Sequence, residues 1–79
     1  MFTKLEEQDV STIQMALFEL MLAHGTDAEV LRVCARTGGN NVLKPETAQV
    51  LAQMHEERSE VYRELRDRLK DVSSIMVEE

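Results

Sequence analysis

Residues 45–76 read PETAQVLAQMHEERSEVYRELRDRLKDVSSIM, and this stretch predicts one long helix. Pro45 suits the first helical position, where the N–H that it lacks would have no partner. Apolar side chains then recur at steps of three and four residues, which is close to a heptad repeat. These predicted interface residues are Leu51, Met54, Val61, Leu65, Leu69 and Val72, with Arg58 as the polar member of the series.

Two shorter helices are predicted before this stretch, over about residues 4–24 and 27–36. Gly25 separates them, because glycine is favoured just beyond a helix C-terminus. Thr26 and Glu29 have the spacing of a capping box for the second helix. A loop over about residues 37–44 then leads to the long helix.

These elements predict an all-α fold in which the three-helix chain forms one domain over residues 1–79. At about 1.5 Å per residue the long helix spans roughly 48 Å, and the two shorter helices together nearly match it. The pattern leaves open whether the two shorter helices are collinear. In either arrangement each helix has a single layer of apolar contact, which dimerisation would complete into a larger bundle.

The chain is short for a stable monomer. A domain of 79 residues buries only about 60–65% of the surface that its unfolded chain exposes. Folds of this size usually add disulfides, a metal or a partner. The single Cys34 cannot form an internal disulfide, so we expect a second copy or another protein to bind.

The sequence contains no recognisable catalytic, cofactor or metal motif. His24 is expected at a helix end and His55 on a helix flank, and neither has a metal-ligand spacing to other donors. Cys34 lies on the apolar face of a short helix and is expected to pack as a small hydrophobe. A lone cysteine and the lack of a secretory signal favour the cytoplasm, and no apolar run is long enough to cross a membrane.

The net charge of −6 is spread unevenly. Residues 27–44 carry three basic and two acidic side chains, whereas residues 45–79 carry five basic and nine acidic ones. Electrostatic contacts are predicted at the following residues: Arg32, Arg36, Glu56, Glu60 and Glu64. The acidic residues form either a solvated face or a surface for a basic partner.

Three hypotheses follow for the function. The first is a non-catalytic protein–protein interaction module, such as an adaptor, small chaperone or regulator, acting as a helical dimer or heteromer. The second is an acidic inhibitor, of the kind that bacteriophages make, whose C-terminal helix occupies a basic surface. The third is a DNA-binding regulator that uses Arg32, Arg36 and Lys44, which are few cations for binding phosphates. We call the series of predicted interface residues in the long helix the seam. Arg58 either sets the register in which this seam pairs with a partner, or packs its stem on the apolar surface and keeps its charge in water.

Overall fold

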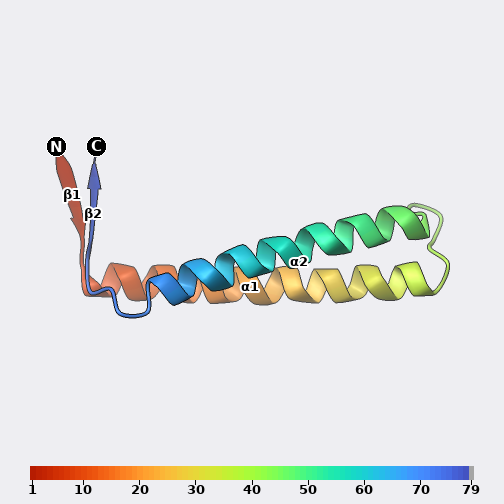
Figure 1. Cartoon of the computed structure of the whole chain (residues 1–79), viewed down its shortest axis with the longest axis horizontal. Helices are drawn as coiled ribbons and strands as arrows, with labels where there is room; N and C mark the ends of the chain where they lie inside the picture. Colours follow the sequence, from red (N-terminus) through yellow and green to blue (C-terminus); the bar gives the residue numbers. More distant parts are fainter. Residues whose placement is uncertain (79) are drawn as a thin grey trace.

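The computed structural model describes residues 1–78 and consists of two long helices that lie side by side. Helix α1 spans Glu7–Arg36 and helix α2 spans Pro45–Arg68. Two short strands, β1 (Phe2–Leu5) and β2 (Ile75–Glu78), pair at the open end of this hairpin and turn away from the helix axes (Figure 1). The predicted all-α, three-helix fold is therefore wrong, because the structure has two helices and a two-stranded antiparallel sheet.

Helix α1 runs without a break through Gly25, where the sequence predicted an end. A glycine inside a helix costs about 1 kcal/mol relative to alanine, which packing along a long partner helix can outweigh. Gly25 faces α2, and a Cβ atom built on it would lie 3.9 Å from the hydroxyl oxygen of Ser59. The predicted helices over residues 4–24 and 27–36 are thus one helix of 30 residues, about 45 Å long.

The connection between the helices occupies residues 37–44. Gly38 and Gly39 have φ angles of 90° and 80°, in the left-handed region that glycine adopts at little cost. A Cβ atom on Gly39 would lie 2.5 Å from the carbonyl oxygen of Leu43, so a larger residue does not fit there. The side-chain oxygen of Asn40 accepts hydrogen bonds from the backbone N–H groups of Val42 and Leu43, both at 2.8 Å.

The two strands include residues 4–5 and 75–76, for which the sequence predicted helix. Helix α2 ends at Arg68 instead of residue 76, and α1 begins at Glu7, whose preceding residue Glu6 donates its backbone N–H to the carboxylate of Asp9 at 2.9 Å. The paired residues are Phe2 with Glu78, Thr3 with Val77, Lys4 with Met76 and Leu5 with Ile75. The aromatic and β-branched residues in these segments favour strands. Pairing of the two ends gives the backbone N–H and C=O groups hydrogen-bond partners that are distant in sequence, whereas a helix would give them neighbouring partners.

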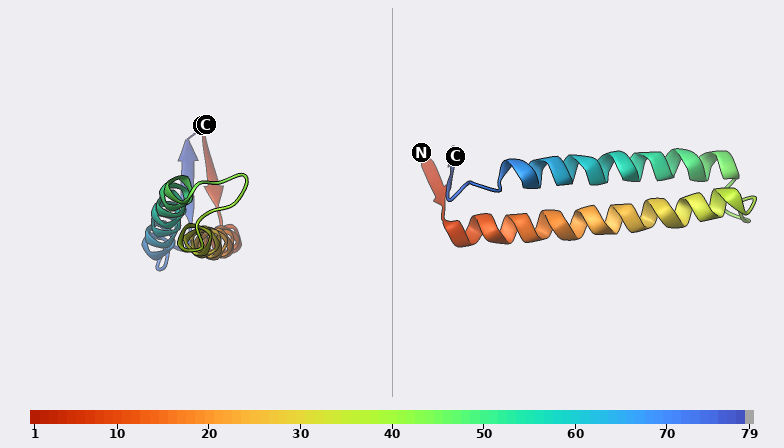
Figure 2. Two further views of the ribbon diagram at one scale, coloured as in Figure 1. Left: turned by 90° about the vertical axis from the view of Figure 1, so that its right-hand side faces the viewer. Right: turned by 60° about the horizontal axis from the view of Figure 1, so that its bottom comes forward.

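Few side chains are buried between the helices. Among residues 1–78 the buried hydrophobic residues are Val10, Leu17, Ala28, Ala48 and Ala52. The molecule is correspondingly long and thin, with extents of 52 × 22 × 15 Å (Figure 2). Its radius of gyration is 17.1 Å, against about 11.6 Å for a compact domain of this length. The chain therefore folds as a hairpin with a narrow internal contact.

Candidate functional site

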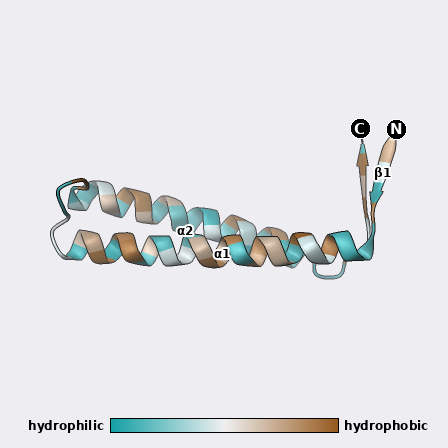
Figure 3. Cartoon of the chain, turned by 180° about the vertical axis from the view of Figure 1, so that it is seen from behind, coloured by the Kyte–Doolittle hydropathy of each residue, from teal (hydrophilic) through white to brown (hydrophobic). Residues whose placement is uncertain are grey.

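Five of the seven predicted interface residues lie on one side of α2, and we call Leu51, Met54, Arg58, Val61 and Leu65 the lateral α2 face. Met54 is 58% exposed and Val61 is 56% exposed, Leu65 and Arg58 are also exposed, and Leu51 is half-buried. Leu69 and Val72, which follow α2, are half-buried. Most of the predicted seam is thus not covered by α1. Figure 3 shows that hydrophobic residues recur along the ribbons of both helices.

The side of α2 that does contact α1 is displaced from the predicted seam by about one residue. Its members are small or polar, with Ala48, Ala52, His55, Ser59 and Tyr62 at alternating steps of four and three residues. Ala48 and Ala52 are fully buried, and the Ser59 hydroxyl donates to the carbonyl oxygen of Met21 at 2.9 Å. Small side chains let the two helix backbones approach closely, which explains why this side forms the internal contact.

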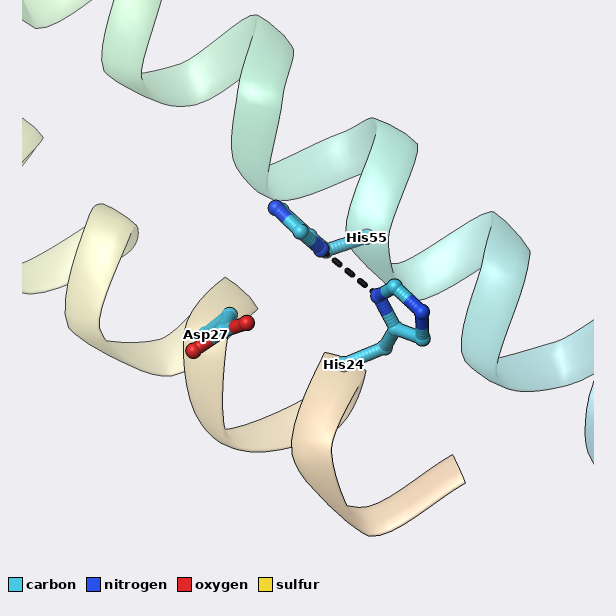
Figure 4. Close-up of side chains that lie close together, drawn as sticks. All are labelled: His24, Asp27 and His55. Atoms are coloured by element: carbon cyan, nitrogen blue, oxygen red, sulfur yellow. Dashed lines mark hydrogen bonds between the residues drawn. The ribbon is translucent and has the colours of Figure 1, made fainter. Parts of the chain in front are cut away.

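Two histidines meet at the middle of this contact. The Nδ1 atoms of His24 on α1 and His55 on α2 lie 2.8 Å apart, at hydrogen-bonding distance (Figure 4). One ring must donate and the other accept, so at least one imidazole is neutral in this arrangement. The Tyr62 ring stacks on His24 with 5.6 Å between centroids, and both histidines are half-buried.

Asp27 adds a carboxylate to the histidine pair. It follows His24 by three residues on α1, so both side chains leave the same side of the helix (Figure 4). One donor atom each from His24, Asp27 and His55 lie within 4.8 Å of one another, which is the spacing of groups that can share a metal ion. We call these three residues the histidine cluster. It was missed by sequence reasoning, which placed His24 at a helix end and His55 on a flank.

A hollow of about 240 Å³ adjoins the histidine cluster. It is lined by His24 and His55, by Tyr62, and by three members of the lateral α2 face, Leu51, Met54 and Arg58. The cluster therefore opens toward the side of the molecule that carries the exposed hydrophobic residues.

Three of the predicted electrostatic residues, Arg32, Glu56 and Glu60, form ion pairs within the chain. Arg32 on α1 donates its Nε–H to a carboxylate oxygen of Glu56 on α2 at 2.9 Å, and this hydrogen bond lowers the pKa of the Glu56 carboxyl below its usual value. Glu60 forms an ion pair with Arg63 on the same helix. Arg36 is exposed in the last turn of α1, where a cation is favourable, and Glu64 is exposed on α2.

Lys44 and Cys34 lie at the closed end of the hairpin. Lys44 is the exposed N-cap residue of α2. The thiol of Cys34 is half-buried and lies 3.7 Å from the side-chain nitrogen of Asn40. The structure brings neither residue to the histidine cluster or to the lateral α2 face.

Comparison with family models, with curated proteins and with solved structures gave no match for this chain. Across the part of the chain that the structure describes, neither helix combines the length and the apolar character that a membrane span needs. Inferences about function therefore depend on the chain's own surfaces and clusters.

Proposed function

We propose that this protein is a non-catalytic protein–protein interaction module whose working form is a dimer of two hairpins. The observation that carries the proposal is the exposure of large hydrophobic side chains on the lateral α2 face, above all Met54, Val61 and Leu65. Exposed large apolar side chains that recur along one face of a helix are typical of a site of association.

The accessible area supports a partner of substantial size. The chain exposes 6085 Å², whereas a compact monomer of 9.0 kDa would expose about 4,850 Å². The excess, about 1,200 Å², is larger than the 800 Å² or so that each partner contributes to a standard interface. Burying this excess on both sides would give an area in the range of obligate dimers.

The chemistry of the face favours a second copy of this chain as the occupant. The lateral α2 face combines apolar residues with the cation of Arg58, and the exposed carboxylates of Glu57 and Glu64 lie beside it on α2. A twofold interface brings the same patch together from both copies, so cations and carboxylates are present on each side. Two hairpins joined in this way form a four-helix arrangement with a wider apolar core.

The ion pairs favour this proposal over the two electrostatic hypotheses. Glu56 and Glu60 are each paired with an arginine of the same chain, which reduces the free negative charge that an inhibitor would present. Arg32 is engaged by Glu56 and is not a free cation for a nucleic-acid phosphate. The single thiol of Cys34 further supports a reducing compartment such as the cytoplasm.

Sedimentation equilibrium of the full chain and of two matched leucine variants tests the proposal. We expect the natural chain to have twice the mass of one 9.0 kDa copy, and Leu65→Glu on the lateral α2 face to have the mass of a single copy. Leu22→Glu is the control, because Leu22 is 50% exposed and lies on α1, outside that face. We expect this control to remain a dimer.

Circular dichroism of both variants reports whether the hairpin is intact, and we expect unchanged helix content because both leucines are exposed. A natural chain that stays at the mass of one copy throughout the accessible concentration range would contradict the proposal. So would dissociation of the dimer by Leu22→Glu but not by Leu65→Glu.

A further inference from the structure

The histidine cluster has the composition of a metal site built from two helices. His24 and Asp27 come from α1 and His55 comes from α2, 31 residues further along the chain than His24. Imidazole nitrogen and carboxylate oxygen are common donors to Zn²⁺ and the neighbouring divalent metals. The two imidazoles are half-buried, so they are already partly removed from water before an ion arrives.

We propose that His24, Asp27 and His55 bind a divalent transition-metal ion of the Zn²⁺ class, which links α1 to α2. This inference goes beyond the proposed dimer and does not depend on it, because all three ligands belong to one chain.

The distance between the two histidines is close to the one that such an ion requires. Zn–N bonds are about 2.0–2.1 Å long, so two nitrogens on a tetrahedral ion lie roughly 3.3 Å apart. The two Nδ1 atoms are now 2.8 Å apart, and small rotations of the imidazoles would open the gap by about 0.5 Å. The N–H···N hydrogen bond between the histidines would be replaced by two metal–nitrogen bonds, with the Nδ1 proton of the donor ring moving through water to the Nε2 atom of the same ring.

The surroundings leave room for the rest of the coordination shell. Three protein ligands leave a fourth coordination position for water or an external group, as in other zinc sites with three protein ligands. The adjoining hollow can hold that group. Arg58 also lines the hollow, and its positive charge disfavours the binding of a cation there. The negative charge of the Asp27 carboxylate favours binding of the ion.

A metal at this place would stabilise a hairpin that has few other fixed contacts. Three of the five buried hydrophobic residues within positions 1–78 are alanines, which contribute little apolar area. A ligand that binds the folded chain and not the unfolded one raises stability in proportion to the logarithm of its concentration over its dissociation constant. The ion would thus act as a cross-link between helices at mid-length.

Titration of the full chain, without an added histidine tag, with ZnCl₂ and CoCl₂ tests the site. We expect one ion per chain and, for Co²⁺, the intense visible absorption of a tetrahedral site with nitrogen ligands. His24→Gln and His55→Gln are each expected to weaken Zn²⁺ binding by at least about 100-fold. Asp27→Asn is expected to weaken it less, because it removes the exposed ligand of the three.

Two control variants separate the site from other donors. Glu29→Gln removes an exposed carboxylate two residues from Asp27 on the same helix, and Cys34→Ser removes the thiol. Both are expected to bind Zn²⁺ as the natural chain does. Leu65→Glu is also expected to retain one ion per chain, so that failure of the dimer and failure of the metal site give different results.

A measurement on the unaltered chain keeps the test decisive if a histidine variant fails to fold. The chain has only two histidines, so their ring protons are readily resolved by NMR. We expect one equivalent of Zn²⁺ to shift the resonances of both rings. Unshifted histidine resonances, no stoichiometric binding, or full affinity in both folded histidine variants would overturn the proposal.

Discussion

The two sides of α2 differ in a way that reverses the usual relation between side-chain size and burial. The side that contacts α1 carries Ala48, Ala52 and Ser59, which are small, and the two alanines are fully buried. The lateral α2 face carries larger apolar residues such as Met54 and Val61, which are more than half exposed. Close approach of two helices selects small residues, so the larger ones remain for a contact outside the hairpin.

The largest expected effect comes from enlarging a residue on the contacting side. Ala52→Leu should destabilise the hairpin by about 1–3 kcal/mol, because a side chain inserted into a close-packed contact forces the helices apart. Urea unfolding followed by circular dichroism measures this change. Ala23→Leu is the control, since Ala23 is exposed on α1, and it should change stability little. Equal stability of both variants would mean that the backbones are not in close contact at Ala52.

The second effect concerns the polar member of the lateral α2 face. Arg58→Leu should tighten self-association about tenfold, because the two leucines of a twofold dimer, each replacing an arginine stem that already covers apolar surface, together contribute on the order of 1–2 kcal/mol. The dissociation constant from sedimentation equilibrium gives the answer. Weaker association would mean that the Arg58 charge has a partner across the interface. The rise in the dissociation constant would then measure the loss of that contact.

A smaller effect, which increases stability, is expected at Gly25, inside α1. Gly25→Ala should stabilise the chain by roughly 0.5–1 kcal/mol, because alanine is the better helix former and its Cβ would meet only the Ser59 hydroxyl at 3.9 Å. Thermal unfolding measures the gain. A helix that ended at Gly25 in a left-handed conformation would be destabilised instead, which would restore the predicted break.

The smallest effect is expected from the ion pair between Arg32 and Glu56, which joins the helices at an exposed position. A double-mutant cycle with Arg32→Gln and Glu56→Gln should give a coupling close to the error of the measurement, and added salt should reduce it further. Coupling as large as the effect of Ala52→Leu would show that surface charge, not close packing, holds the helices together.

The sequence was a reliable guide to helix where apolar residues recur and an unreliable one at the chain ends and at Gly25. Periodicity reports that a helix has an apolar side, and most of residues 7–36 and 45–68 follow that rule. The pairing of β1 with β2 joins residues 70 to 76 positions apart, for which the local pattern carries no signal. A glycine inside a helix and a glycine beyond its end look alike in sequence, because the difference depends on the partner helix.

The histidine cluster was hidden for a related reason. The sequence predicts His24 at a helix end and His55 on a flank, because large hydrophobic residues define the predicted seam. The series Ala48, Ala52, His55, Ser59 and Tyr62 has heptad spacing of its own, and small residues at such spacing are the signal that could have placed His55 opposite α1. The small side chains of Ala48, Ala52 and Ser59, more than hydrophobicity alone, favour this side of α2 for the contact with α1.

The most direct test of this account is an isotope-filtered NMR experiment on a mixture of labelled and unlabelled copies, which detects only contacts between chains. We expect contacts between copies at the methyl groups of Met54, Val61 and Leu65, and none at those of Ala48 and Ala52. Contacts between copies at the two alanines, with none on the lateral α2 face, would show that the exposed hydrophobic residues are not the interface and would contradict the account.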